Sequence, residues 1–435
     1  MNLTKKFNRL VSGDSSAVFK GMATLALGSG GARLIGIAAI PVLTRLYSPE
    51  DFGVLAVFAA LVAIAAPLMT LRYVLALPLP RRDGTALNLL ALAIGLMLVG
   101  TVLTTLIFGV FGRELLSALS MEALIPWWWL IGVGVLAASS YELMTYWATR
   151  RRAYKIIAKT NVWQSASGSI VKVGLGMMSL TPLGLLLGDV VAKGGGLARL
   201  IREFMTDLKK MPGSVSWYRV RKVGHFYRDF PYFRVPSQFL MVFSQQIPLL
   251  FSAAVYGPET TGQLSLALMA LALPVTLVGG TMGKALYAEA ASIGMRQPDK
   301  IYRITKDVQR KLLVFAIPVG ALLFAFGEQA FVLFFGDEWK QAGMYASILC
   351  VYMVFLFTSG PLVQLLNVVA SQTTFLAINI IRTFIMIVLF SIIYIGGLGD
   401  YVFVVSYSLV MSLFYLFVSF FVFLSVRRSA NARIN

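Results

Sequence analysis

Long apolar runs separated by short polar stretches fill almost the whole chain. A helix needs roughly 20 apolar residues to cross the hydrocarbon core of a bilayer, and twelve runs have about that length. They lie near residues 20–46, 52–79, 85–110, 123–148, 156–179, 181–205, 230–256, 262–289, 311–335, 343–367, 371–396 and 401–426. The pattern predicts an all-α polytopic membrane protein with about 12 transmembrane helices.

Composition agrees with this prediction. Of 435 residues, 58% are hydrophobic and 13% are charged, whereas about 25% are charged in a soluble domain. The first apolar run is long enough for a full span and contains Arg33, so we expect an uncleaved helix and no signal peptide. The chain has one cysteine, Cys350, and one histidine, His225. We therefore expect no disulfide, no metal site and no cofactor.

The distribution of basic residues predicts the orientation in the membrane. With a cytoplasmic N-terminus, 28 of the 38 Lys and Arg residues fall in inner loops and tails, three in outer loops and seven inside the apolar runs. An excess of Lys and Arg in short loops marks the cytoplasmic side. Both termini are therefore expected inside. The net charge of +19 then reflects topology and contact with anionic membrane lipids, and we expect no nucleic acid partner.

A short motif occurs twice. The stretch "LYSPEDFG" ends the first apolar run, and "VYGPETTG" ends the seventh. In each, we expect Pro to end a helix, Glu to favour the next helix N-terminus, and Gly to permit a tight corner. The repetition indicates a duplicated six-helix unit, whose halves are parallel because six is even. We predict an N-terminal lobe at 1–205, a basic cytoplasmic linker at 206–229, and a C-terminal lobe at 230–435.

Aromatic residues start two of the runs at the predicted outer face. They are Trp127 to Trp129 and Trp339. Tryptophan is enriched at membrane interfaces, and we expect interfacial anchors at both places.

Nine ionisable residues lie inside the apolar runs, where a charge is costly unless it faces a partner or a cavity. Seven are basic, namely Arg33, Arg72, Lys172, Lys193, Arg234, Lys284 and Arg382, and two are acidic, Glu142 and Asp189. Asp189 and Lys193 are four residues apart on one helix and can form a pair. Glu142 is open to pairing with Arg150 to Arg152 or to titration during transport. These acidic residues, with Lys172 and Lys193, are candidates for pairing or coupling.

The excess of positive charge inside the membrane predicts an anionic ligand. Guanidinium groups suit a phosphate or pyrophosphate well. Arg33, in "GSGGARLIG" near the middle of the first run, is the strongest candidate, and Arg382 is next. Arg72, Arg234 and Lys284 are predicted within roughly 10–13 Å of the inner surface at 1.5 Å per residue, where they can also snorkel toward the cytoplasm. These five residues form the predicted substrate-binding set.

Four segments resemble one family. They are "IPVLTRLYSPEDFGVLAVFAALVAIAAPLMTLRYVLALPLPRRD" at Ile40 to Asp83, "YWATRRRAYKIIAKTNVWQS" at Tyr146 to Ser165, the segment from Tyr227 to Gly280, and "LFFGDEWKQAGMYASIL" at Leu333 to Leu349. In this order they are similar to bacterial lipopolysaccharide, O-antigen and exopolysaccharide biosynthesis proteins. Those proteins are repeat-unit flippases of the multidrug, oligosaccharidyl-lipid and polysaccharide (MOP) exporter superfamily.

The resemblance implies a MATE-like fold with two six-helix lobes around a central cationic cavity. It also implies a transporter, not an enzyme, in the bacterial inner membrane. The implied substrate is an undecaprenyl-diphosphate-linked oligosaccharide, moved from the inner to the outer leaflet by alternating access. A polysaccharide polymerase and a chain-length regulator are candidate partners. Arg33 and Arg72 fall in matching segments of the first lobe, and Arg234 and Lys284 in the second.

Two other functions fit the same pattern less well. A MATE-like drug exporter of the same superfamily binds cationic drugs through buried carboxylates, whereas the charges inside these runs are mostly basic. A membrane polysaccharide polymerase or ligase needs a catalytic outer loop, and the longest outer loop here spans only Phe111 to Glu122. The chain has no G-x-x-x-x-G-K-[ST] phosphate loop, so we expect no ATP hydrolysis.

Overall fold

The computed structural model describes residues 16–209, 215–293, 297–366 and 372–431, and these residues form helices and no strand. Part of the predicted linker, 210–214, lies outside the described residues. The main helices are α2 (Ser16–Leu46), α3 (Pro49–Met69), α4 (Asp83–Ser117), α5 (Trp129–Arg150), α6 (Tyr154–Met177), α7 (Leu183–Gly194), α8 (Leu197–Lys209), α9 (Trp217–Phe226), α10 (Val235–Pro274), α11 (Gly280–Ile293), α12 (Pro298–Phe335), α13 (Lys340–Val363), α15 (Gln372–Ile395) and α16 (Asp400–Asn431). Short helical turns lie between them: η1 (Tyr73–Ala76), η2 (Glu122–Trp127), η3 (Phe230–Arg234), η4 (Val275–Gly279) and η5 (Asp337–Trp339).

Eight helical segments within the described residues are long and apolar enough to cross a membrane. They are Leu27–Leu46, Pro49–Met69, Asp83–Ser117, Phe230–Tyr287, Asp299–Phe335, Asp337–Val363, Leu376–Ile395 and Asp400–Arg427. The segment Phe230–Tyr287 contains two of the predicted runs, which are divided at Gly257, where the backbone leaves the helical region with φ 83°. The remaining predicted runs form α5, α6 and the two short helices α7 and α8, of 12 and 13 residues, between which the sixth predicted run is divided. The prediction of an all-α polytopic membrane protein is confirmed.

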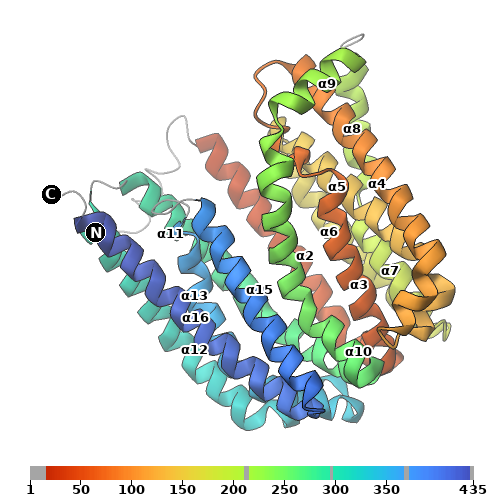
Figure 1. The fold of residues 1–435 in the computed structure, drawn as a ribbon, viewed down its shortest axis with the longest axis vertical. Helices are drawn as coiled ribbons and strands as arrows, with labels where there is room; N and C mark the ends of the chain where they lie inside the picture. The colour runs from red at the N-terminus through yellow and green to blue at the C-terminus, as the bar shows by residue number, and fades with distance from the viewer. Residues whose placement is uncertain (1–15, 210–214, 294–296, 367–371, 432–435) are drawn as a thin grey trace. The chain divides into compact units, whose positions relative to one another are not determined.

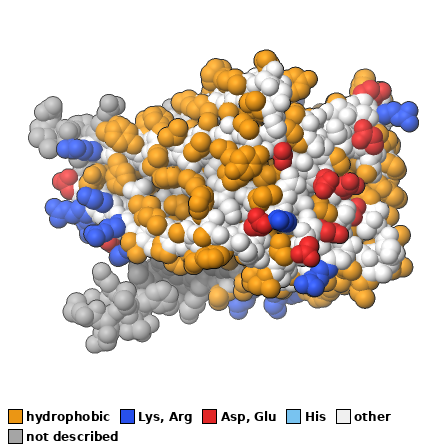
Figure 2. Space-filling model, turned by 90° about the horizontal axis from the view of Figure 1, so that it is seen from below, with side chains coloured by type: hydrophobic (Ala, Val, Ile, Leu, Met, Phe, Trp, Pro, Cys, Tyr) orange, Lys and Arg blue, Asp and Glu red, His pale blue; other side chains and the backbone are white. Residues whose placement is uncertain are grey.

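Large apolar side chains face outward along several helices. Leu103 in α4, Phe324 in α12 and Leu413 in α16 are 54%, 63% and 66% exposed. Figure 2 shows that hydrophobic side chains cover much of the visible face, with charged side chains gathered in small groups. Exposed apolar surface of this extent marks an interaction site in a soluble protein, whereas lipid contact accounts for it here.

The chain forms two compact units. The first contains residues up to Tyr47 together with 57–242, and the second contains 48–56 and 243–435. In the first unit, α6 packs against α2 and α7; in the second, α13 packs against α12 and α16, which run side by side in Figure 1. The division falls inside α10 after Val242. The predicted lobe limits at 205 and 230 rest on the sequence repeat and stay predictions.

The tyrosine of each Tyr-x-Pro-Glu motif donates a hydrogen bond to a backbone carbonyl in its own unit. The Tyr47 hydroxyl donates to the carbonyl of Lys172 in α6 at 2.7 Å, and the Tyr256 hydroxyl donates to the carbonyl of Leu398, just after α15, at 2.8 Å. The helices α6 and α15 correspond to the fifth and eleventh predicted runs, but the acceptor of Tyr47 lies inside α6 and that of Tyr256 lies beyond the end of α15. The duplication stays a prediction from the sequence.

The first motif also starts a helix in a way that the sequence analysis did not identify. The backbone N–H of Ser48 donates to the Asp51 carboxylate at 3.1 Å, and the N–H of Asp51 donates to the Ser48 hydroxyl at 3.2 Å. This reciprocal pair is a capping box, with Asp in place of the usual Glu. Pro49 therefore begins α3 at its first position, three residues after α2 ends at Leu46.

The glycines of the motifs have a different function from the predicted one. Gly53 lies inside α3, and Gly262 lies inside α10 beyond the bend. A Cβ on Gly53 would lie 1.9 Å from the carbonyl oxygen of Pro258, and one on Gly262 would lie 1.7 Å from that of Pro49. The two helices therefore cross in backbone contact within the second unit. The glycines permit this close crossing and do not form tight corners.

Trp339 was expected as an interfacial anchor, but its side chain is completely buried. Its ring packs edge to face against Phe52 with centroids 4.9 Å apart. An edge-to-face pair of this kind stabilises by about 0.5–1.5 kcal/mol beyond area burial. Trp339 thus holds the start of α3 in the second unit.

Candidate functional site

Two basic side chains are buried among the described residues, Arg72 at 7% exposure and Arg382 at 8%. Arg72 belongs to the first unit and follows α3, and Arg382 belongs to α15 in the second unit. A buried guanidinium is stable only with hydrogen-bond acceptors around it. The acceptors around each guanidinium therefore decide which of its N–H groups remain available to a ligand.

The backbone at Arg72 is strained. Leu71 and Arg72 have φ values of 44° and 59°, a left-handed conformation that is uncommon in residues with a side chain. Arg72 occupies the N-cap position of η1. Such a conformation costs roughly 1–3 kcal/mol per residue and persists only where the surroundings enforce it. The side-chain contacts of Arg72 supply that constraint.

The Arg72 guanidinium is held by two other helices. Its Nη1 donates to Glu142 Oε1 in α5 at 2.9 Å, and its Nη2 donates to Gln238 Oε1 in α10 at 3.4 Å. The Nε atom is buried and has no hydrogen-bond partner. The sequence left snorkelling open for Arg72, and either pairing with Arg150 to Arg152 or titration open for Glu142. The structure pairs Arg72 and Glu142 with each other instead.

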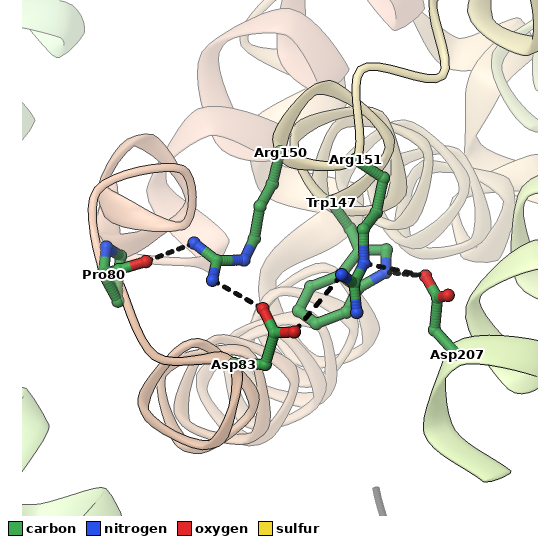
Figure 3. A network of polar contacts seen from close by, with 6 residues as sticks. All are labelled: Pro80, Asp83, Trp147, Arg150, Arg151 and Asp207. Atoms are coloured by element: carbon green, nitrogen blue, oxygen red, sulfur yellow. Dashed lines mark hydrogen bonds and ion pairs between the residues drawn. The ribbon is translucent and has the colours of Figure 1, made fainter. Parts of the chain in front are cut away.

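Arg150 and Arg151 instead form a network with two aspartates (Figure 3). Arg150 Nη2 lies 2.7 Å from Asp83 Oδ1 at the start of α4, and Arg151 Nη1 lies 3.3 Å from Asp83 Oδ2. The Nε of Arg151 and the indole Nε1 of Trp147 share Asp207 Oδ2 in α8, at 3.1 and 3.2 Å. The network ties α4, α5 and α8 together. It neutralises basic residues that the sequence placed on the cytoplasmic side.

A second ionic cluster joins α6 to α7 in the first unit. Lys193 Nζ lies 2.7 Å from Asp189 Oδ2, so the predicted pair four residues apart is confirmed. Lys172 Nζ from α6 lies 3.8 Å from Asp189 Oδ1. The three side chains are 16–23% exposed. Two lysines thus share one carboxylate, which leaves a local excess of one positive charge.

Arg382 lies in a polar environment in the second unit. Its Nε donates to the Ser244 hydroxyl in α10 at 3.0 Å, and one Nη atom also contacts that oxygen. Tyr352 and Tyr407 lie close enough to interact with it electrostatically, and their rings pack with centroids 5.5 Å apart. Ser244 was not identified from the sequence, because a lone serine in an apolar run carries no distinguishing signal.

The other predicted basic residues are exposed. Arg33 lies in α2, Arg234 in η3 and Lys284 in α11. None of the three forms an ion pair within the described part of the chain. A Cβ added to Gly30 or Gly31, beside Arg33, would meet no atom within 4 Å. Arg33 therefore lies next to open space.

Polar side chains near Arg33 connect α2, α5 and α6. Asn161 Nδ2 donates to the Ser29 hydroxyl at 3.1 Å, and Tyr141 donates to Asn161 Oδ1 at 2.8 Å. The Ser165 hydroxyl donates to the carbonyl of Ala32 at 2.5 Å. These bonds hold neighbouring helices together, as is common in membranes. Among the described residues no three His, Cys, Asp or Glu side chains gather as metal ligands.

A sequence model described as polysaccharide biosynthesis protein matches residues 42–344. The chain belongs to the polysaccharide biosynthesis protein family. The matched segment includes the Arg72–Glu142 pair and the Asp189 cluster, whereas Arg33 and Arg382 lie outside it. A comparison with curated proteins gives no match.

Solved structures show which fold this family member has. An inward-facing MATE family multidrug resistance transporter of the MOP superfamily is 14% identical, with a TM-score of 0.62 over 95% of this chain and 96% of that chain. An outward-facing structure described in the same way has 14% identity and a TM-score of 0.62, and covers 98% of both chains. A MOP superfamily transporter from Pyrococcus furiosus, described as having reverse polarity of its binding pocket that suggests a different function, has 14% identity and a TM-score of 0.59 over 98% of both chains. The protein therefore has the MATE-like fold that the sequence resemblance implied.

Proposed function

We propose that this protein is a flippase. It translocates undecaprenyl-diphosphate-linked oligosaccharide repeat units across the bacterial inner membrane, for lipopolysaccharide, O-antigen or exopolysaccharide biosynthesis. It acts by alternating access, in which the substrate site opens to one side of the membrane at a time. Membership of the polysaccharide biosynthesis protein family and the MATE-like fold support transport of a polysaccharide precursor.

The observation that carries the proposal is the position of Arg33. At 1.5 Å per residue, its Cα lies about 20 Å from the outer end of the membrane-spanning part of α2 at Leu46 and about 9 Å from the beginning of that part at Leu27. A charge inside a span is costly unless it faces a cavity or a polar partner. The open space beside Gly30 and Gly31 leaves room for one.

An anionic partner fits the charges of the membrane-spanning helices. Arg33, Arg234 and Lys284 form no ion pair within the described residues, and Arg72 retains a buried Nε donor with no acceptor. A diphosphate offers several oxygens to such donors and suits the planar guanidinium fork. We assign the diphosphate to Arg33, Arg72, Arg234, Lys284 and Arg382, and the lipid tail to the bilayer.

The acidic residues disfavour export of cationic drugs. Glu142 is engaged by Arg72, and Asp189 by two lysines. A cationic drug would have to displace these side chains from partners that are already well placed. The same engagement makes both carboxylates candidates for coupling, since a change of protonation would release a basic side chain.

Substitution of Arg33 tests the proposal. In a strain that depends on this protein, Arg33→Ala should abolish surface polysaccharide while the amount of protein in the membrane stays unchanged, and Arg33→Lys should keep part of the export. Arg81→Ala removes an exposed arginine outside the predicted spans and serves as the control, with normal export. Normal export by Arg33→Ala would overturn the assignment of the diphosphate to Arg33.

A transport assay on the purified protein identifies the substrate class without relying on surface polysaccharide in cells. The purified protein in liposomes should move a fluorescent undecaprenyl-diphosphate sugar to the inner leaflet, and free inorganic pyrophosphate should inhibit this movement. Transport of a cationic dye with no movement of the diphosphate lipid would favour the drug exporter instead.

A further inference from the structure

The helix α9 (Trp217–Phe226) has ten residues and lies in the first unit. Its length of about 15 Å is half the thickness of the hydrocarbon core, so it does not cross the membrane. Its sequence, "WYRVRKVGHF", contains three Lys and Arg residues and no acidic residue. The helix is therefore cationic, and it stays out of the hydrocarbon layer.

One face of α9 is fixed against α4. Val220 and Val223 are buried on this face, at 6% and 8% exposure. The N–H of Ser216, just before the helix, donates to Asn88 Oδ1 in α4 at 3.0 Å, and a Cβ on Gly224 would lie 3.0 Å from Leu92. These contacts set the rotation of α9 about its axis. They decide which side chains face outward.

The outward face combines aromatic and cationic side chains. Tyr218, Arg221, Lys222 and His225 are spaced as i, i+3, i+4 and i+7, so they share one side of the helix, and all four are exposed. Tyr218 is 74% exposed, and Trp217 at the helix start is 82% exposed. Large aromatic rings are unfavourable in water, and cations are unfavourable in hydrocarbon. The headgroup layer of a membrane is the one environment that suits both.

We infer that this face of α9 binds the headgroups of anionic phospholipids in the cytoplasmic leaflet. The occupant is a lipid because the aromatic rings need an apolar layer next to the phosphates, which neither a soluble polyanion nor free phosphate provides. Arg221 and Lys222 contact the phosphates, and the rings of Trp217 and Tyr218 lie at the level of the headgroups. The sequence places this segment on the cytoplasmic side, where anionic lipids attract basic residues.

The helix also contacts the turn that contains Arg72. The Tyr73 hydroxyl, next to Arg72 in the chain, donates to the carbonyl of Gly224 in α9 at 2.9 Å. Lipid bound to α9 therefore stabilises the helix on which the Arg72 turn rests. The effect on transport rests on the proposed function, whereas lipid binding itself does not.

Lipid binding is measured on the full-length protein in detergent by native mass spectrometry, with titration of phosphatidylglycerol or phosphatidylcholine. We expect the protein to prefer phosphatidylglycerol. The double variant Arg221→Gln/Lys222→Gln should bind it at least tenfold more weakly, since each basic residue that contacts the bound headgroup changes affinity roughly fivefold. The double variant Arg81→Gln/Arg82→Gln removes two exposed arginines that are not part of this face of α9 and should change affinity less than threefold.

Two further variants separate the aromatic and cationic contributions. Arg221→Lys keeps the charge and should keep the preference for phosphatidylglycerol. Tyr218→Ala should weaken binding of both lipids by a similar factor. The reason is that the tyrosine ring contacts the headgroup layer, which both lipids form, and does not depend on the net charge by which the two lipids differ. Equal binding of the two lipids by the unsubstituted protein, or equal losses in the two double variants, would overturn the inference. Neither result depends on transport, so the proposed function would be unaffected.

Discussion

The Arg72 guanidinium and the Glu142 carboxylate meet at 2.9 Å inside the first unit, although 70 positions separate them in the chain. The Arg72 side chain is 8% exposed and that of Glu142 is 27% exposed. Arg72 is the more deeply buried partner. Loss of the Glu142 carboxylate should therefore destabilise the folded state more than loss of the Arg72 guanidinium. Breaking a pair of this kind leaves a charge without compensation.

Glu142→Gln should therefore lower the free energy of unfolding by ~2–3 kcal/mol, somewhat less than for a fully buried pair. The change is measured by denaturant titration of the detergent-solubilised protein. Adding Arg72→Gln to Glu142→Gln should restore part of the loss, because the uncompensated cation is removed. A double variant less stable than Glu142→Gln alone would contradict this account.

The Asp189 cluster offers a matched comparison. Asp189–Lys193 and Asp307–Lys311 have the same spacing of four residues and the same 2.7 Å distance, but the second pair is 59–73% exposed. Asp189→Asn should cost ~2–3 kcal/mol, because two partly buried lysines lose their counter-charge. Asp307→Asn should cost no more than about 0.5 kcal/mol. Similar losses for both variants, by the same denaturant titration, would show that burial of Asp189 is unimportant.

The crossing of α3 and α10 predicts a large effect of a single methyl group. Gly262→Ala places a Cβ on the Pro49 carbonyl oxygen, so the two helices must separate. We expect loss of export and a lower melting temperature. Gly360→Ala in α13 meets no atom within 4 Å and should be neutral or stabilising by about 0.5–1 kcal/mol. A normal melting temperature and normal export by Gly262→Ala would argue against a tight crossing.

The same crossing suggests a cross-linking test of the outer side. Cysteines at Ser48 and Thr260, in a Cys350→Ser background, should form a disulfide on oxidation. Because the two motifs lie in one unit and cross in backbone contact, export should continue with the bridge formed, whereas a gate at which the motifs separate would stop export until the bridge is reduced. Each single-cysteine variant, oxidised in the same way, is the control. Efficient export with the bridge intact would exclude an outer gate at this point.

The charge asymmetry predicts the topology. Reporter fusions at Gly84 and near the C-terminus should give cytoplasmic signals, and fusions at Asp337 and Thr260 should give external ones. The reason is the excess of basic residues in the loops on one side. An external signal at Gly84 would reverse the orientation and remove the basis for placing α9 at the cytoplasmic leaflet.

The sequence by itself determined the features that depend on short stretches of chain. Long apolar runs predicted the membrane-spanning helices, because a bilayer accepts only segments that satisfy their own backbone hydrogen bonds. The Asp189–Lys193 pair followed from the geometry of one helix turn. The recurring Tyr-x-Pro-Glu motif indicated a duplication, and each tyrosine donates a hydrogen bond to a backbone carbonyl in its own unit.

Only the tertiary structure decided which side chains meet. The partner of Glu142, the addition of Lys172 to Asp189, the burial of Trp339 and the crossing at Gly53 and Gly262 were missed or wrongly predicted. In a soluble helix, the apolar stripe shows which face is buried. In a membrane helix, the faces toward lipid and toward protein are both apolar, so the pattern carries no information about packing. The contacts depend on shape and on a few polar groups, and those are fixed only when the helices come together.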